Sequence, residues 1–61
     1  MDRMMIPNNP VMLLSFVNMK LRDDYSSLDE MCRSLDIERA EITEKLGSIG
    51  YTYNAGYNQF K

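Results

Sequence analysis

The feature that most constrains this 61-residue chain is a helix-forming stretch near its start. Asn9 offers a capping side chain directly before Pro10, which suits the first helical position. From Pro10 to Arg22 the apolar side chains fill an arc of roughly 220° at about 100° per residue. An ordinary surface helix has an apolar stripe little more than about 100° wide. The rest of the chain, a partner, or both must therefore cover this helix.

One edge of the apolar arc is a candidate partner surface. It consists of Met12, Phe16 and Met19, which lie one and two turns apart. The competing interpretation, which we favour, is that a later hairpin or the N-terminal arm covers this edge as part of the core. Ser15, Asn18 and Arg22 form the polar stripe opposite the arc, as expected for a helix in a water-soluble domain.

Composition restricts the chemistry available to the chain. A chain of 61 residues buries only about 60 % of the surface of its unfolded form, so its core is small. The chain has one cysteine and no histidine, which excludes an intramolecular disulfide and a Cys/His zinc site within one chain. Cys32 lies on the apolar side of a predicted helix, so we expect a buried hydrophobe rather than an exposed thiol. We expect no cofactor.

The middle of the chain predicts a second helix over residues 28–35. Ser27 and Glu30 have the spacing of a capping box, in which two side chains reciprocally satisfy two orphan amides at a helix start. Leu28, Met31, Cys32 and Leu35 then recur at helical spacing, which indicates one buried face.

A third helix is predicted over residues 39–49, after a tight connection over residues 36–38. Gly50 lies just past its end, where a left-handed residue commonly closes a helix. Gly47 lies inside it and costs up to about 1 kcal/mol relative to alanine. Its presence indicates either close packing at that position or an early helix end.

Two short strands are predicted at residues 51–53 and 58–60. A four-residue loop between them pairs Tyr53 with Asn58, which gathers Tyr51, Tyr53 and Phe60 on one face. A three-residue loop pairs Tyr53 with Tyr57 and moves Phe60 to the other face. We prefer the first register because it places the aromatic rings against the helices.

The order of elements predicts a mainly α fold with a small β-hairpin, arranged as a three-helix, helix-turn-helix, winged-helix-like single domain. An extended N-terminal arm is expected over residues 1–8 and the domain over residues 9–61. The apolar spacing of the second and third helices fits a helix-turn-helix. Asp36 occupies the turn position that glycine usually holds in that motif.

Charge argues against nucleic-acid binding by this motif. The net charge is −2, and the exposed side of the third helix has three acids against two bases. If the chain is nevertheless a weak nucleic-acid-binding winged helix, the contacts are Arg39, Thr43 and Lys45. The competing interpretation is a solvated charged face, with Glu41 and Lys45 spaced as a helical ion pair.

Catalysis and membrane insertion are also disfavoured. The chain lacks a histidine for general-base chemistry near neutral pH, and no glycine-rich phosphate loop or calcium loop is present. Its apolar runs fall short of the roughly 18 residues that span a bilayer. No export signal is visible, so we expect a cytoplasmic protein.

Several segments resemble one small bacterial family. They are Ile6-Pro7-Asn8-Asn9-Pro10 with the helix that follows, Tyr25-Ser26-Ser27-Leu28, Ile49-Gly50-Tyr51-x-Tyr53 and Asn58-Gln59-Phe60. Together they are similar to the domain of unknown function 4250. The resemblance covers the chain from about Met5, which leaves open whether residues 1–4 belong to the native start. It implies a free-standing bacterial cytoplasmic protein and brings no activity, ligand or catalytic residue.

The sequence therefore predicts a non-enzymatic protein-interaction or regulatory module. We expect it to bind a protein partner or to self-associate. Weak nucleic-acid binding is the alternative.

Overall fold

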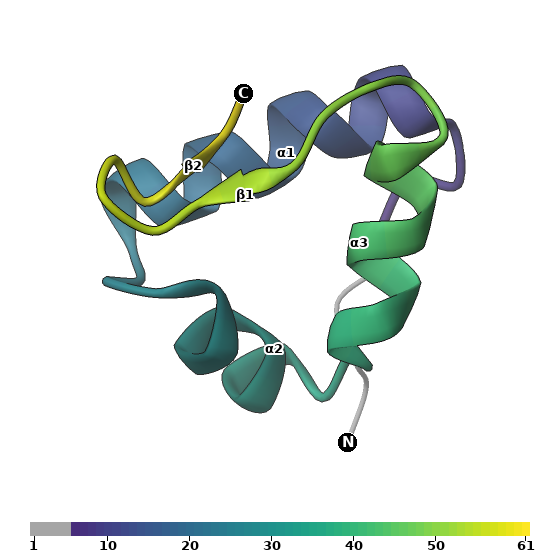
Figure 1. The fold of residues 1–61 in the computed structure, drawn as a ribbon. Coiled ribbons are helices and arrows are strands. Elements are labelled where there is room, and N and C mark those ends of the chain that lie inside the picture. The colour runs from purple at the N-terminus through teal and green to yellow at the C-terminus, as the bar shows by residue number, and fades with distance from the viewer. Residues whose placement is uncertain (1–5) are drawn as a thin grey trace.

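The computed structural model describes residues 6–61 and contains three helices followed by one hairpin (Figure 1). The elements are α1 (Pro10–Asp23), α2 (Leu28–Leu35), α3 (Arg39–Gly47), β1 (Tyr53–Asn54) and β2 (Gln59–Phe60). The prediction of a mainly helical fold with a small β-hairpin is confirmed. Of the expected arm, residues 1–5 lie outside the described part of the chain, and Ile6 packs against the core.

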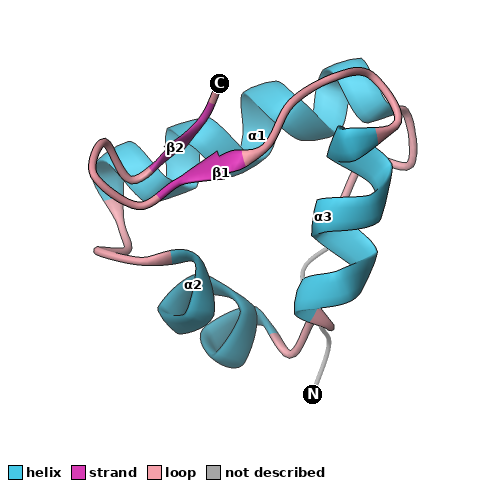
Figure 2. Ribbon diagram, viewed as in Figure 1, coloured by secondary structure: helices cyan, strands magenta, loops and turns pink. Residues whose placement is uncertain are grey.

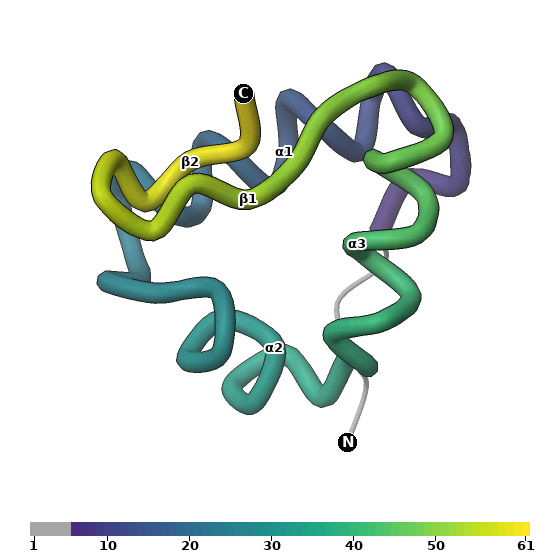
Figure 3. The backbone as a smooth tube through the Cα atoms, viewed as in Figure 1, coloured from purple at the N-terminus to yellow at the C-terminus, as the bar shows by residue number. Residues whose placement is uncertain are grey.

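The long helix α1 is the element on which the others assemble. It packs against α2, α3 and β2. The backbone trace shows α1 along one side of the molecule, α2 and α3 forming the other two sides, and the chain returning along α1 in the hairpin (Figure 3). The buried side chains of all these segments form one core cluster: Leu13, Val17, Leu21, Leu28, Met31, Cys32, Ile37, Ile42, Leu46 and Phe60.

Local capping explains where α1 and α2 begin. The Asn9 side-chain oxygen accepts from the amides of Val11 at 2.9 Å and Met12 at 3.3 Å, as the sequence predicts. The Ser27 hydroxyl accepts from the amide of Glu30 at 3.1 Å, which confirms one half of the capping box. The Glu30 carboxylate accepts instead from the amide and hydroxyl of Ser26, at 2.9 and 2.7 Å. The second hydrogen bond of the box therefore comes from the amide of Ser26, one residue before the expected amide of Ser27.

The third helix ends two residues earlier than predicted. α3 stops at Gly47, and a Cβ added there would have no neighbour within 4 Å. Gly47 therefore reflects an early helix end and not close packing. Gly50 adopts φ +88°, a left-handed conformation, and the amide of Tyr51 donates to the carbonyl of Leu46 at 3.0 Å. This geometry closes the helix in the way that the glycine predicts.

Between α2 and α3 the chain turns through a left-handed residue. Asp36 has φ 58° and ψ 51°, a conformation that glycine adopts most readily. The amide of Ile37 then donates to the carbonyl of Cys32 at 2.9 Å, and Ile37 is buried. Asp36 thus makes the turn between α2 and α3 without glycine.

Both predicted hairpin registers are wrong. Tyr53 pairs with Phe60 and Asn54 with Gln59, in an antiparallel sheet of two strands (Figure 2). Asn58 adopts φ 53° and belongs to the loop rather than to a strand. Its side chain bonds to the backbone carbonyls of Leu21 and Tyr25, outside the hairpin. The rings of Tyr53 and Phe60 still meet, with centroids 5.5 Å apart. Tyr51 lies before the paired strands and is 36 % exposed, so it does not join them in the core.

Candidate partner surface on the outer side of α1

The side of α1 that faces away from the core carries uncovered apolar side chains. Val11 is 63 % exposed, Met12 61 % and Met19 43 %. Phe16 is only half-buried but packs against the core, and the Lys20 ammonium lies 5.8 Å from its ring centroid. Of the predicted edge, Met12 and Met19 are therefore exposed, whereas Phe16 packs against the core. We define the outer face of α1 as Val11, Met12 and Met19.

An open groove of about 550 Å³ lies between α1 and the hairpin, and Met19 belongs to both the groove and the outer face. Its lining consists of Ser15, Asn18, Met19, Leu21 and Arg22 from α1 and Tyr57, Asn58 and Gln59 from the hairpin. The residues predicted to form the polar stripe of α1 therefore face the hairpin as well as solvent.

Asn18 holds the hairpin against α1. Its side-chain amide donates to the carbonyl of Phe60 at 3.1 Å, and its oxygen accepts from the amide of Phe60 at 2.8 Å. The Asn18 side chain thus pairs with the backbone of β2 as a neighbouring strand would. The side chain of Phe60 is buried, with 1 % exposed, directly beside this pair of bonds.

A second side-chain amide, that of Asn58 in the hairpin loop, joins the hairpin to the end of α1. The Asn58 nitrogen donates to the carbonyls of Leu21 at 2.9 Å and Tyr25 at 3.0 Å. Its oxygen accepts from the Tyr53 hydroxyl at 2.7 Å, and that hydroxyl accepts from the amide of Leu28 at 3.2 Å. One hydrogen-bonded chain thus joins the end of α1, the hairpin and the start of α2.

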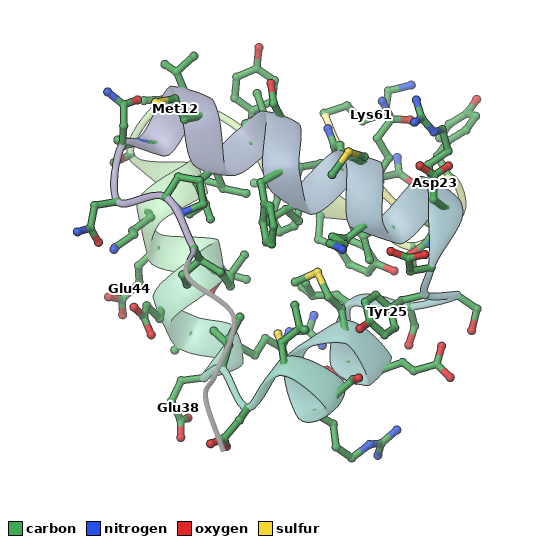
Figure 4. All side chains as sticks on the ribbon, turned by 180° about the vertical axis from the view of Figure 1, so that it is seen from behind. Met12, Asp23, Tyr25, Glu38, Glu44 and Lys61 are labelled. Atoms are coloured by element: carbon green, nitrogen blue, oxygen red, sulfur yellow. The ribbon has the colours of Figure 1, made fainter. Side chains whose placement is uncertain are left out.

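An aromatic ring from the hairpin loop and a cation from the residue after β2 lie at the rim of the groove. Tyr57 is 67 % exposed, and the Lys61 ammonium lies 4.0 Å from its ring centroid. Figure 4 shows Met12 near the start of α1 and Lys61 nearer its end, both on the side away from α2 and α3. The outer face of α1 is therefore apolar at its start and bordered by charged side chains of both signs, including Lys61 and Asp23, towards its end.

The groove itself contains one formal charge among its described lining residues, the guanidinium of Arg22. Arg22 donates to both carboxylate oxygens of Asp23, at 2.8 and 3.0 Å, just outside that lining. These hydrogen bonds lower the pKa of Asp23 and raise that of Arg22. Both side chains are at least half exposed, so solvent screens the pair and other anions can reach the guanidinium.

The residues expected to contact nucleic acid are engaged elsewhere. Arg39 bonds to Asp29 at 2.6 Å, and Lys45 bonds to Asn8 at 3.1 Å and lies 3.9 Å from Glu41. The Thr43 hydroxyl donates to the carbonyl of the third residue before it, within its own helix. Six positions of helix separate Arg39 from Lys45, which places them about 120° apart around the axis. The structure does not gather these side chains for contact with one ligand.

A second hollow, of about 370 Å³, lies at the turn between α2 and α3. Its lining includes Cys32, Asp36, Glu38 and Glu41. Cys32 is 6 % exposed, which confirms the prediction of a buried thiol, and desolvation raises its pKa. Within residues 6–61 no group of three or more Cys, Asp or Glu side chains is placed to hold a metal ion.

Sequence reasoning missed Val11, Arg22 and Tyr57 as parts of this surface. Val11 follows the helix start directly and is exposed. The groove depends on where the hairpin docks, and the sequence left the hairpin register open. One signal was available: Asn18 interrupts an apolar helix, and asparagine in a helix interior is a reason to look for a hydrogen-bonding partner.

Comparison with known proteins gives one match. The model of the family described as Domain of unknown function (DUF4250) matches residues 7–60. No curated protein and no solved structure matches the chain. Winged-helix assignment therefore stays a prediction. In the described part of the chain, no helix is both long and apolar enough to cross a membrane.

Proposed function

We propose that this chain, which belongs to the family described as Domain of unknown function (DUF4250), is a non-enzymatic module that binds another protein through the outer face of α1. The proposal includes a winged-helix-type fold and a bacterial cytoplasmic setting. It rests on the chemistry of the surface, because membership of this family brings no activity with it.

The observation that carries the proposal is the exposure of Val11, Met12 and Met19 on one helix face. The apolar side chains on the opposite side of α1 are buried, so this helix contributes to the core and still presents apolar surface to solvent. Methionine is enriched at the centre of protein interfaces and adapts its shape to a partner. An exposed apolar patch rimmed by polar residues is typical of an interaction site.

The chemistry of the chain supports binding rather than catalysis. The sequence contains no histidine, and its one thiol is buried with a raised pKa, so little nucleophilic thiolate exists near neutral pH. The carboxylates that bond to Arg22, Lys20 and Arg39 are exposed, and each serves an ion pair at the surface. An acid or base for catalysis normally lies in a cleft with a perturbed pKa.

A photocrosslinking experiment tests the proposal in cells that naturally make the protein. A benzophenone amino acid is placed at Met12 or Met19 in the full chain, and at Glu44 on the exposed side of α3 as a matched control. Ultraviolet irradiation should give a discrete protein adduct from the α1 positions and none from Glu44. Absence of adducts from both α1 positions, or equal adducts from Glu44, contradicts a binding role for this face.

A further inference from the structure

We propose that the groove between α1 and the hairpin binds an acidic peptide segment of the partner, with an apolar side chain on Met19 and Tyr57 and a carboxylate on Arg22. This inference rests on the proposed function and deepens it, because it names the chemistry of what binds. The occupant is a short linear segment of another protein, not a second copy of this chain.

Charge is the first argument for an acidic segment. The whole chain has nine acids and seven bases, yet no Asp or Glu belongs to the described lining of this groove. The one charged lining residue is Arg22, and the Lys61 ammonium lies on the Tyr57 ring at the rim. The groove lining is therefore positive, although Asp23 just outside it pairs with Arg22 and offsets part of that charge. The attraction of the lining acts within about 10 Å at 0.1 M salt, so it selects for charge in the bound segment itself.

The lining also has the side-chain types that anchor interfaces. Tyrosine, arginine and methionine are all enriched in protein interfaces, and the first two dominate energetic hot spots. Tyr57 lines the hairpin wall of the groove, and Met19 lines the α1 wall. An apolar side chain between these walls removes both from water. Ser15 and Gln59 supply neutral hydrogen-bonding groups for the backbone of an extended segment.

The present partner of Arg22 leaves room for such a ligand. Asp23 follows Arg22 directly and binds its Nε and one terminal nitrogen, while a guanidinium carries five N–H donors. Asp23 therefore competes with a ligand carboxylate without closing the site. A second copy is a poorer occupant, because a symmetric contact of groove with groove brings together two linings that contain Arg22 and no carboxylate.

Peptide display on the purified full chain tests this inference. A library of random dodecapeptides is selected on the immobilised protein, and the affinity of enriched peptides is measured by fluorescence anisotropy. We expect sequences that combine Asp or Glu with Leu, Met or Phe. Arg22→Glu and Tyr57→Ala should each weaken binding by roughly tenfold or more. Binding should also weaken as salt rises, because Arg22 is exposed.

Charge-matched variants separate a specific site from a general charge effect. Asp23→Asn should tighten binding several-fold by freeing the guanidinium, whereas Glu44→Gln makes the same charge change on α3 and should leave affinity unchanged. Arg33→Glu, on the outer side of α2, is the matched control for Arg22→Glu. Equal losses from Arg22→Glu and Arg33→Glu overturn the inference.

The remaining outcomes also decide the question. Enrichment of basic peptides, no enrichment above the Arg22→Glu variant, or concentration-dependent self-association blocked by Arg22→Glu overturns the inference. Chemical-shift changes of the Ser15, Met19 and Gln59 amides on peptide addition support it, and changes confined to other parts of the chain overturn it. Crosslinked adducts from Met12 together with failed peptide selection leave the proposed function standing and remove only the acidic segment.

Discussion

Replacing Asn18 by alanine removes the two hydrogen bonds that tie α1 to the backbone of Phe60. The lost acceptor leaves the Phe60 amide without its partner beside a side chain that is 1 % exposed. A buried unsatisfied group costs about 1–3 kcal/mol, and the second bond adds about 1 kcal/mol. Alanine favours the helix by up to about 0.7 kcal/mol relative to asparagine. We therefore expect the free energy of unfolding to fall by about 1–3 kcal/mol.

That loss is large for a domain of this size. At about 0.05–0.15 kcal/mol per residue, a 61-residue chain has a stability of about 3–9 kcal/mol. A shift in Tm of about 4–8 °C per kcal/mol places the expected drop at about 5–25 °C. Urea unfolding followed by far-ultraviolet circular dichroism measures the free energy, and amide hydrogen exchange at Phe60 locates the effect in the hairpin.

Two variants check the reasoning on Asn18. Ser15→Ala removes an exposed polar side chain one turn earlier on the same stripe, so its effect should stay within about 0.5 kcal/mol. Asn18→Asp keeps an acceptor for the Phe60 amide but directs a carboxylate at the Phe60 carbonyl, so it should not restore stability. The reasoning is refuted if the free energy of unfolding of Asn18→Ala lies within about 0.5 kcal/mol of that of the native chain. It is also refuted if hydrogen exchange at the Phe60 amide is unchanged.

Three further predictions follow from other features. Tyr53→Phe removes the hydroxyl that joins the hairpin to the start of α2 and should cost about 1–2 kcal/mol in urea unfolding; an unchanged midpoint refutes the link. Gly47→Ala should stabilise by up to about 1 kcal/mol, whereas Gly50→Ala, at φ +88°, should destabilise by about 1–2 kcal/mol; melting curves that shift in the same direction contradict this assignment. Hydrogen bonds from Ser26 lower the pKa of Glu30 below its ordinary 4.5, so the stabilisation they give is present above about pH 4.5 and is lost as pH falls through the folded pKa. Urea midpoints measured from pH 7 to pH 3 should therefore fall less steeply for Glu30→Gln than for the native chain, and equal slopes refute the claim.

Local signals in the sequence located the helices. Asn9 before Pro10, and Ser27 before Glu30, are capping patterns whose hydrogen bonds span two or three residues, so the sequence contains all the information they need. The starts of α1 and α2 were predicted for that reason, and the end of α2 was predicted from apolar spacing that stops at Leu35. The early end of α3 remained one of two possibilities, because a helical glycine is compatible with either a close contact or a terminus.

The hairpin and the surface beside it could not be derived in the same way. The register depends on Asn58, whose side chain bonds to carbonyls 37 and 33 positions away in the chain. No periodicity encodes such a partner. The same limit applies to the partner surface: spacing placed Phe16 with Met12 and Met19, whereas the core reaches far enough around α1 to take the Phe16 ring and leave both methionines exposed.

The two hydrogen bonds between the Asn18 side chain and the Phe60 backbone influence the order in which the chain folds. The two residues are 42 positions apart, so forming these bonds first would require closure of a long loop, at an entropic cost of about 3 kcal/mol. The helices α2 and α3 lie inside that loop, and their prior formation shortens the flexible chain that must close. We therefore expect the hairpin to join α1 late, in one cooperative step, and their amides to exchange together as a single unfolding unit.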